Sequence, residues 1–167
     1  MRLESGRIAA IYFIVALGLL TEHLEQAMPQ SIKKGYKALL AEADAVVPAL
    51  EVDEARALQG KEGVVFVDLR DPREIEREGK MPGAFHCPRG MLEFWIDPES
   101  PYHKPVFGED KRFVFFCAGG WRSALAAKTA IEMGLEPVSH LKGGFGAWKK
   151  AGAPTEMPKP HENSSAS

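Results

Sequence analysis

Residues 112–128 read RFVFFCAGGWRSALAAK, and the order of residue types in this stretch decides the fold. Four strand-forming residues at 113–116 lead to Cys117, two glycines follow, and an alanine-rich helical pattern begins shortly after them. The stretch therefore predicts a strand, a tight loop and the first turns of a helix. In an open α/β sheet such a loop lies at the carboxyl edge of the strands, where these folds bind their ligands.

The loop after this strand offers Cys117 the surroundings of a reactive thiol. Gly119 and Gly120 allow backbone conformations closed to other residues, so successive N–H groups can turn inward around whatever the cysteine carries. The first turn of the helix adds unpaired N–H groups and the positive end of its dipole, which favour a thiolate or a bound anion. Packing is the commoner role of a buried cysteine, but it does not explain two glycines and Arg122 at this place. We interpret Cys117 as a nucleophile.

The 167 residues are enough for one domain with a hydrophobic core and short extensions. The formal net charge is -2 without a long run of one sign, which does not favour binding to nucleic acid. Two cysteines, Cys87 and Cys117, do not make a disulfide framework, so we expect a reducing, cytoplasmic location. The five histidines are scattered without ligand spacing, and we predict no metal site and no cofactor.

The chain divides by composition into three parts. Residues 1–27 contain an apolar run at 8–20, for which three interpretations stay open: a membrane-associated segment, an extension upstream of a translation start at Met28, and a cleaved signal. Contact with a membrane is expected only if this run acts as an anchor, which makes a membrane-associated location the alternative. Residues 28–156 carry the globular pattern. Residues 157–167 have too little apolar surface to fold and are predicted to be disordered.

Strand and helix patterns alternate on both sides of the central stretch. Strands are predicted at 64–70, 84–87 and 137–141, and helices from Ser31 as N-cap to a point before Val46, at 52–58, at 71–77, and after Gly143-Gly144 with Phe145 and Trp148 in the core. This alternation predicts an α/β fold with a mostly parallel central sheet and helices on both faces. Asp68 and Arg70 end their strand at the same edge as Cys117. A proline-rich loop at 97–106 is expected to border the active site.

Three blocks of the chain carry recognisable motifs: VVFVDLRDPREIE with MPGAFHCPRG behind it, FVFFCAGGWRS, and LKGGFGAWKKAGAP. In this order and spacing, over residues 50–154, they resemble a single-domain rhodanese, a sulfurtransferase-type domain. The resemblance implies that Cys117 accepts a sulfane sulfur from a small anionic donor, such as thiosulfate, and holds it as a persulfide. It further implies that a nucleophilic acceptor, which is cyanide or a thiol and can be a protein thiol, then removes the sulfur.

The resemblance also implies a cradle for the transferred sulfur, built by the loop residues Ala118, Gly119, Gly120, Trp121, Arg122 and Ser123. A persulfide is anionic near neutral pH and needs inward N–H groups and a positive dipole rather than a general base. Asp68 and Arg70 match the family's aspartate and arginine; they either support the site or form a structural ion pair. Arg122 is expected to hold the rim of the loop by pairing with Asp68 or Glu74.

Three other functions stay open. Related phosphatases have five residues between cysteine and arginine, whereas four lie between Cys117 and Arg122, and the smaller loop favours sulfur over phosphate. A non-catalytic binding or sulfur-sensing module would use the same fold without turnover. A redox protein would use Cys87 as a resolving thiol. Ala118 stands where thiosulfate-using relatives often carry a basic residue, which weakens the case for thiosulfate as the natural donor.

Overall fold

The computed structural model of the protein describes residues 31–158. The chain falls into two compact units, residues 1–35 and residues 36–167, and every helix and strand given below belongs to the second. The predictions for residues 1–27, and those for all but the first two residues of the tail at 157–167, lie outside the described residues. Within the described range, no helix is long and apolar enough to cross a bilayer.

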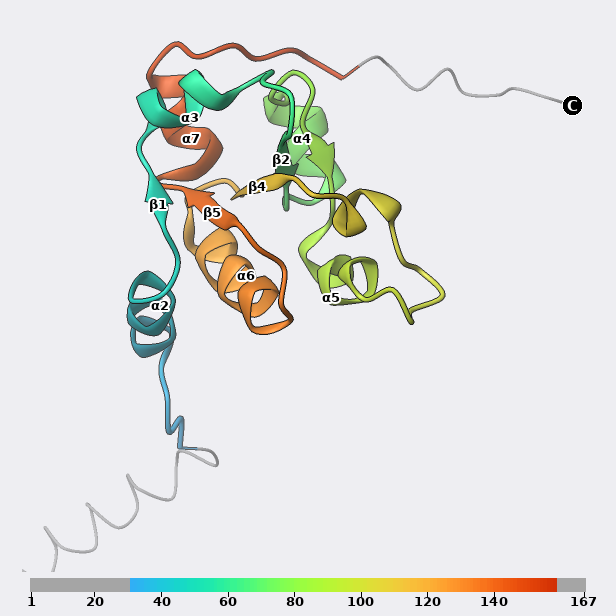
Figure 1. Cartoon of the computed structure of the whole chain (residues 1–167). Helices are drawn as coiled ribbons and strands as arrows, with labels where there is room; N and C mark the ends of the chain where they lie inside the picture. The colour runs from blue at the N-terminus through green and yellow to red at the C-terminus, as the bar shows by residue number, and fades with distance from the viewer. Residues whose placement is uncertain (1–30, 159–167) are drawn as a thin grey trace, which may run out of the picture. The chain divides into compact units, whose positions relative to one another are not determined.

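Five strands form one parallel sheet at the centre of the second unit (Figure 1). Their order across the sheet is β1-β5-β4-β2-β3, and every neighbouring pair is parallel. The strands are β1 (Ala49–Leu50), β2 (Val64–Asp68), β3 (Phe85–His86), β4 (Arg112–Phe116) and β5 (Val138–Leu141). The predicted parallel α/β architecture is confirmed. β4 lies in the middle, as its continuous apolar run requires, because both of its faces are covered.

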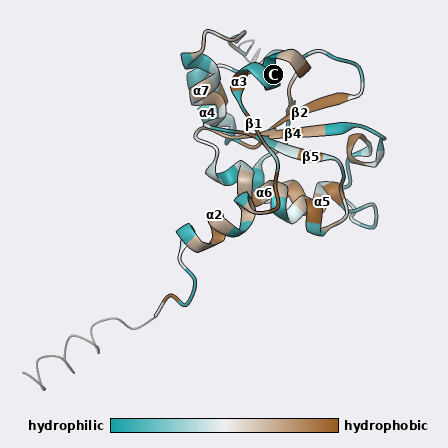
Figure 2. Ribbon diagram, turned by 60° about the vertical axis from the view of Figure 1, so that its left-hand side comes forward, coloured by the Kyte–Doolittle hydropathy of each residue, from teal (hydrophilic) through white to brown (hydrophobic). Residues whose placement is uncertain are grey.

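Helices cover both faces of this sheet, also as predicted. The helices are α2 (Tyr36–Asp44), α3 (Val52–Leu58), α4 (Pro72–Glu78), α5 (Leu92–Ile96), α6 (Trp121–Glu132) and α7 (Gly144–Lys150), with 3-10 turns η1 (Arg89–Met91) and η2 (Pro105–Gly108). Figure 2 shows α3, α4 and α7 on one side of the strands and α2, α5 and α6 on the other. Each strand is thus followed by a helix that packs back onto the sheet.

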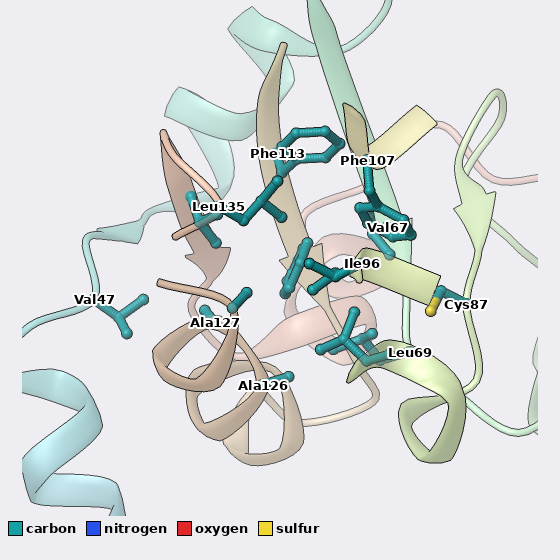
Figure 3. Packing of buried hydrophobic residues seen from close by; sticks show 14 of the residues in the cluster. Val47, Val67, Leu69, Cys87, Ile96, Phe107, Phe113, Ala126, Ala127 and Leu135 are labelled. Carbon is teal, nitrogen blue, oxygen red and sulfur yellow. The ribbon is translucent and has the colours of Figure 1, made fainter. Parts of the chain in front are cut away.

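Alternate residues of β4 point to opposite faces of the sheet, and each face has its own hydrophobic core. Phe113 and Phe115 belong to the cluster formed with α5 and α6, part of which is shown in Figure 3. Val114 and Phe116 belong to the cluster on the other face. Trp148 of α7 is fully buried in that second cluster, as the sequence predicts. The two cores hold β4, and with it the start of the Cys117 loop, in a fixed place.

The predicted start of the first helix is wrong. α2 begins at Tyr36 and not directly after Ser31, and Ile32 is 77% exposed. The intervening residues 33–35 are two lysines and a glycine. Lysine at a helix N-terminus is opposed by the helix dipole, and glycine is a poor helix former, so the apolar spacing alone does not extend the helix upstream.

The proline-rich loop at 97–106 does not border the candidate site. The chain passes from this loop into β4 at Arg112, the amino end of the strand, whereas Cys117 follows the carboxyl end. His103 of the loop lines a hollow together with Gly134, which lies just beyond the C-terminal end of α6. Because the two ends of a strand lie at opposite edges of a sheet, this loop and the Cys117 loop are on opposite edges.

Candidate active site

Cys117 is the first residue after β4, at the carboxyl edge of the sheet. Its side chain is 1% exposed. The N–H group of Gly120 donates a hydrogen bond to Sγ of Cys117 at 3.2 Å. The thiol lies 3.7 Å from Oγ of Ser123, which itself donates to the carbonyl of Gly120 at 2.9 Å. The loop therefore closes around the sulfur through its own polar groups.

Gly120 gives the loop its tight turn and forms the N-cap of α6. Its φ of 97° lies in the left-handed region that favours glycine. A Cβ at this position would come within 3.1 Å of the amide nitrogen of Gly143, so the close approach also requires glycine. The first amide groups of α6 have no partner inside the helix, and the positive end of its dipole lies beside Cys117. These features favour a negative charge on the sulfur or on a group attached to it.

The first turn of α7 holds the back of the loop. The N–H of Phe145 donates to the carbonyl of Cys117 at 2.7 Å, and the N–H of Gly146 donates to the carbonyl of Ala118 at 2.9 Å. A Cβ on Gly144 would lie 2.3 Å from the carbonyl oxygen of Cys117, far inside contact distance. Glycine at 144 is therefore a condition for this packing. With the carbonyl groups bound on this side, the loop is held in the orientation in which the N–H of Gly120 donates to the sulfur.

Arg122 and Glu74 form an ion pair at the rim of the loop. Both terminal nitrogens of Arg122 donate to the carboxylate of Glu74, each at 2.7 Å. Of the two partners considered from the sequence, Glu74 is the one the structure shows. The hydrogen bonds from Arg122 lower the pKa of Glu74 to about 2. The same bonds raise the pKa of Arg122, with smaller contributions from Cys117. Arg122 and Cys117 line the same pocket.

Asp68 and Arg70 form a buried ion pair that does not line the opening over the sulfur. Arg70 is fully buried; its Nε donates to the carboxylate of Asp68, and one terminal nitrogen bonds to the same carboxylate at 2.6 Å and to the carbonyl of Gly79 at 2.9 Å. The guanidinium carbon lies 3.9 Å from the centre of the Phe145 ring. These contacts join β2, the end of α4 and the start of α7. The pair thus supports the loop indirectly, through the helix that holds it.

An open pocket of about 460 Å³ lies over the sulfur and is lined by Cys117, Gly119, Trp121 and Arg122. Trp121 is 62% exposed and packs against Tyr36 of α2, with 5.4 Å between the ring centroids. The indole therefore forms one wall of the pocket.

Cys87 is not placed to form a disulfide with Cys117. The registers of β2 with β3 and with β4 put Leu69 between the two cysteines, at the same level of the sheet. Two strand spacings of about 4.8 Å separate them, whereas the Cα atoms of a disulfide lie within about 7 Å. Both thiols are free, and burial raises the pKa of Cys87 to about 12. Cys87 packs in the apolar cluster beside Leu69 (Figure 3).

The site is not arranged for a metal ion or for a histidine base. Within residues 31–158, no three His, Cys, Asp or Glu side chains form a cluster that could hold a metal. The ring of His86, at the neighbouring strand end, is held by the backbone carbonyl of Arg70 at 2.8 Å. The thiol of Cys117 and the guanidinium group of Arg122 are the reactive and charged side-chain groups among the residues that line the pocket.

The sequence predicted the residues around Cys117, but it did not predict the contribution of α7. The structure places Ala118, Gly119 and Gly120 in the loop after Cys117, and Trp121, Arg122 and Ser123 in the first turn of α6. It brings Glu74 to Arg122 at the rim and holds Asp68 and Arg70 in a buried ion pair that does not line the pocket. The role of Gly144 was not predicted. The Gly143-Gly144 pair before an apolar helix was the available signal, because glycines there permit one backbone to approach another closely.

The profile of the rhodanese-like domain family matches residues 51–151, which is more than half of the chain. The protein belongs to this family. The matched range contains the Cys117 loop, the Arg122–Glu74 pair and the first turn of α7.

Curated relatives include sulfurtransferases. A sulfurtransferase of Allochromatium vinosum is 30% identical over 105 residues, which are 63% of this chain and 90% of the relative. Thiosulfate sulfurtransferase/rhodanese-like domain-containing protein 3 of Mus musculus is 29% identical over 100 residues, 57% of this chain and 64% of the relative. Uncharacterized protein slr1261 of Synechocystis is 33% identical over 102 residues, 61% of this chain and 52% of the relative. The chain thus spans less than two thirds of the last two relatives.

Solved structures with this fold include a protein of unknown function from Rhodopseudomonas palustris, described as a possible tyrosine phosphatase. It is 64% identical, with a TM-score of 0.75, and the match covers 77% of this chain and 99% of that one. A thiosulfate sulfurtransferase from Pseudomonas aeruginosa is 25% identical, with a TM-score of 0.58, over 74% of this chain and 23% of that one. A rhodanese-related protein from Thermoplasma volcanium, at 21% identity and a TM-score of 0.54 over 66% of this chain and 99% of that one, shares the fold.

Proposed function

We propose that the protein is a sulfurtransferase that carries a sulfane sulfur on Cys117 as a persulfide. The observation that carries the proposal is the hydrogen bond from the N–H of Gly120 to Sγ of Cys117, made at the N-terminus of α6 with Arg122 at the rim. Such surroundings stabilise a thiolate and an anionic persulfide without a general base. Membership of the rhodanese-like family and the sulfurtransferases among its relatives support the same chemistry.

In the first half-reaction, the thiolate of Cys117 attacks the outer sulfur of a small anionic donor such as thiosulfate. A bond forms between the two sulfur atoms, the S–S bond of the donor breaks, and sulfite leaves with the electron pair. The new outer sulfur carries a negative charge, which the amide groups of residues 118–123 stabilise. Arg122 contributes a positive potential that attracts the donor. Ala118 carries no charge, so Arg122 and the dipole of α6 supply this attraction.

In the second half-reaction, a nucleophilic acceptor attacks the outer sulfur of the persulfide. Cyanide forms thiocyanate, and a thiolate forms a new persulfide; in both cases the bond to Cys117 breaks and its electron pair restores the thiolate. The open pocket over Cys117 also gives a protein thiol room to approach. Because donor and acceptor use the same sulfur in turn, the kinetics should be ping-pong.

The experiment that tests this function is thiocyanate formation from thiosulfate and cyanide, with Cys117→Ser and Cys87→Ser as a matched pair. We expect activity in the wild type and in C87S, and none in C117S. Cys87 is buried and its pKa is raised, so we expect it to take no part in the transfer. Loss of activity in a folded C87S variant would instead favour the redox protein with a resolving thiol.

Phosphatase activity is the second candidate, because the 64% identical protein from Rhodopseudomonas palustris is described as a possible tyrosine phosphatase. We rank phosphatase activity behind sulfur transfer for two reasons. Four residues separate Cys117 from Arg122, and both terminal nitrogens of Arg122 are engaged by Glu74 instead of being free to grip a phosphate. We expect no hydrolysis of p-nitrophenyl phosphate above the C117S background. Hydrolysis that depends on Cys117, without any sulfur transfer, would reverse the order of the two candidates.

A binding or sulfur-sensing module remains the alternative without turnover. Such a module would take up sulfur on Cys117 and fail to pass it to cyanide or to a thiol. We further propose a cytoplasmic setting, since the free thiols of Cys87 and Cys117 fit a reducing compartment. Fractionation of cells that produce the full chain tests this setting; recovery with membranes would favour the alternative of an anchored protein.

A further inference from the structure

Helix α2 lies outside the part of the chain that matches the family. The matched range begins at residue 51, whereas α2 covers residues 36–44 and packs against α6 on one side of the sheet (Figure 2). Tyr36 is the first residue of α2 and Trp121 the first residue of α6, and their ring planes are inclined by 32° where the two side chains meet. A helix outside the matched range thus contacts a residue of the candidate active site.

Trp121 keeps most of its side chain exposed although it packs against Tyr36. The exposed fractions are 62% for Trp121 and 54% for Tyr36, whereas tryptophan is highly buried on average. Packing of the hydrophobic core therefore does not explain a tryptophan at this place. The contact with Tyr36 restricts the indole, so its apolar surface is in position at the pocket before a ligand binds.

The pocket over Cys117 offers a sulfur donor one charged group and one large apolar surface. Arg122 is the only cation among the residues that line it, and Trp121 supplies the apolar surface. Glu74 binds both terminal nitrogens of Arg122 and offsets part of its charge. A small inorganic anion makes no use of the indole. A donor that also carries an apolar group therefore uses more of the pocket.

There is room for such an apolar group beside the indole. The pocket over Cys117 has a volume of about 460 Å³, and a neighbouring pocket of about 400 Å³ is also lined by Trp121. Leu40, Val47 and Ala124 add apolar surface to the neighbouring pocket. Volumes of this size hold small organic molecules. A ring of carbon atoms can thus lie against Trp121 while the sulfur that it carries reaches Cys117.

We propose that Trp121, positioned by Tyr36, determines the donor specificity of the site and favours sulfur donors that carry a flat apolar group. The inference rests on the proposed sulfur transfer, and arenethiosulfonates are its probes. The thiolate of Cys117 attacks the outer sulfur of the thiosulfonate. A bond forms between these two sulfur atoms, the S–S bond of the donor breaks, and the arenesulfinate leaves with the electron pair. The ring of the donor packs against Trp121 and loses its contact with water, which favours binding.

The test compares benzenethiosulfonate with methanethiosulfonate, which share the reacting group and a single negative charge and differ in the apolar group. The second-order rate constant for loading Cys117 with sulfur is followed by intact mass. Each value is divided by the rate constant of the same donor with 2-mercaptoethanol in the absence of protein, which corrects for the two leaving groups. We expect the corrected value to be roughly tenfold higher for benzenethiosulfonate, because its ring is covered by the indole.

Trp121→Ala should reduce the ratio between the two donors to about one. Tyr36→Ala should lower the ratio because the indole loses its support, whereas Tyr36→Phe keeps the ring and should preserve it. Tyr102→Ala is the matched control, since Tyr102 is 60% exposed but lies in the loop at the opposite edge of the sheet. A ratio that survives in W121A or in Y36A, that falls as much in Y36F as in Y36A, or that also falls in Y102A overturns the inference.

A competition measurement on the wild-type chain depends neither on the folding of a variant nor on a leaving group. Benzenesulfonate and methanesulfonate have no sulfane sulfur, so they can only compete with thiosulfate for the site. Benzenesulfonate should slow the loading of Cys117 by thiosulfate at a roughly tenfold lower concentration than methanesulfonate does. Equal inhibition by the two sulfonates, or inhibition by neither, would mean that the indole binds no apolar group and would overturn the inference.

The loading step separates the two possible failures. If neither thiosulfate nor either thiosulfonate adds sulfur to Cys117, the proposed sulfur transfer itself fails, and the inference fails with it. If sulfur is added but the two thiosulfonates react at equal corrected rates, the transfer stands and only the role of Trp121 is wrong.

Discussion

Arg122 and Glu74 face each other across the carboxyl edge of the sheet, and both terminal nitrogens of the arginine bind the carboxylate at 2.7 Å. The two residues are 48 positions apart in the chain, in the first turns of α6 and α4. These helices start side by side because the strands that precede them, β4 and β2, are neighbours in the sheet. The parallel register thereby places a fixed cation at the rim of the Cys117 loop.

Arg122→Ala should reduce kcat/KM for an anionic sulfur donor by roughly tenfold, because the pocket over the sulfur loses the cation that lines it. Arg73→Ala is the matched control: it removes one exposed positive charge from the neighbouring α4 without touching the loop. Steady-state kinetics with thiosulfate measure the effect. Equal rates in R122A and R73A would show that Arg122 has no part in donor use beyond its net charge.

Glu74→Gln should make the stability of the protein less sensitive to acid. The folded-state pKa of Glu74, about 2, lies below its ordinary value of 4.5, so the stabilisation is complete above about pH 4.5 and is lost as the pH falls toward 2. In urea unfolding, the wild type should exceed E74Q in stability at pH 6, and the difference should shrink at pH 3. A difference that stays constant over this range would contradict the assignment of the low pKa to Glu74.

Gly144→Ala should displace the Cys117 loop and lower sulfur transfer, because the new Cβ would lie 2.3 Å from the carbonyl oxygen of Cys117. We expect a loss of about 1 to 3 kcal/mol in the free energy of unfolding from overpacking and backbone strain. Gly134→Ala is the control, since Gly134 also has a positive φ but nothing within 4 Å of an added Cβ. If both variants lose the same stability and keep the same activity, the contact between α7 and the loop is not needed.

Arg70→Met should destabilise the protein by about 3 to 5 kcal/mol, because it leaves the carboxylate of Asp68 buried without its partner. The double variant D68N/R70M removes both charges and should be more stable than R70M alone. Denaturant unfolding of the two variants and the wild type provides the measurement. A double variant less stable than R70M would show that Asp68 has a stabilising role apart from the pair.

The central strand, loop and helix were predictable because their signals are local. The apolar run at 113–116, the two glycines and the alanines each favour one conformation over a few residues. The position of Asp68 at the same edge as Cys117 followed from the rule that parallel strands end at one edge. The predicted start of α2 was wrong. The apolar spacing indicated a helix from just after Ser31, but residues 33–35 do not favour a helix N-terminus.

The contacts that complete the site depend on packing and were not readable from the sequence. Two partners were possible for Arg122, Asp68 and Glu74. Asp68 forms its ion pair with Arg70, and Arg122 pairs with Glu74. Glycine is needed at position 144 only because α7 packs against the Cys117 loop. Cys117 lies 27 residues before Gly144 in the chain, so this contact is not a local one. Sequence patterns indicate which face of a helix or strand is buried, whereas these contacts depend on how helices and strands pack against one another.

The most direct test of the account is the intact mass of the reduced protein after incubation with thiosulfate and again after cyanide, with C117S in parallel. We predict that the wild type gains the mass of one sulfur atom, that cyanide removes it, and that C117S gains none. Because the identity of the natural sulfur donor is not established, the loading step is repeated with mercaptopyruvate and with a protein persulfide. No added sulfur with any of the three donors, or sulfur that is still added to C117S, would contradict a persulfide on Cys117.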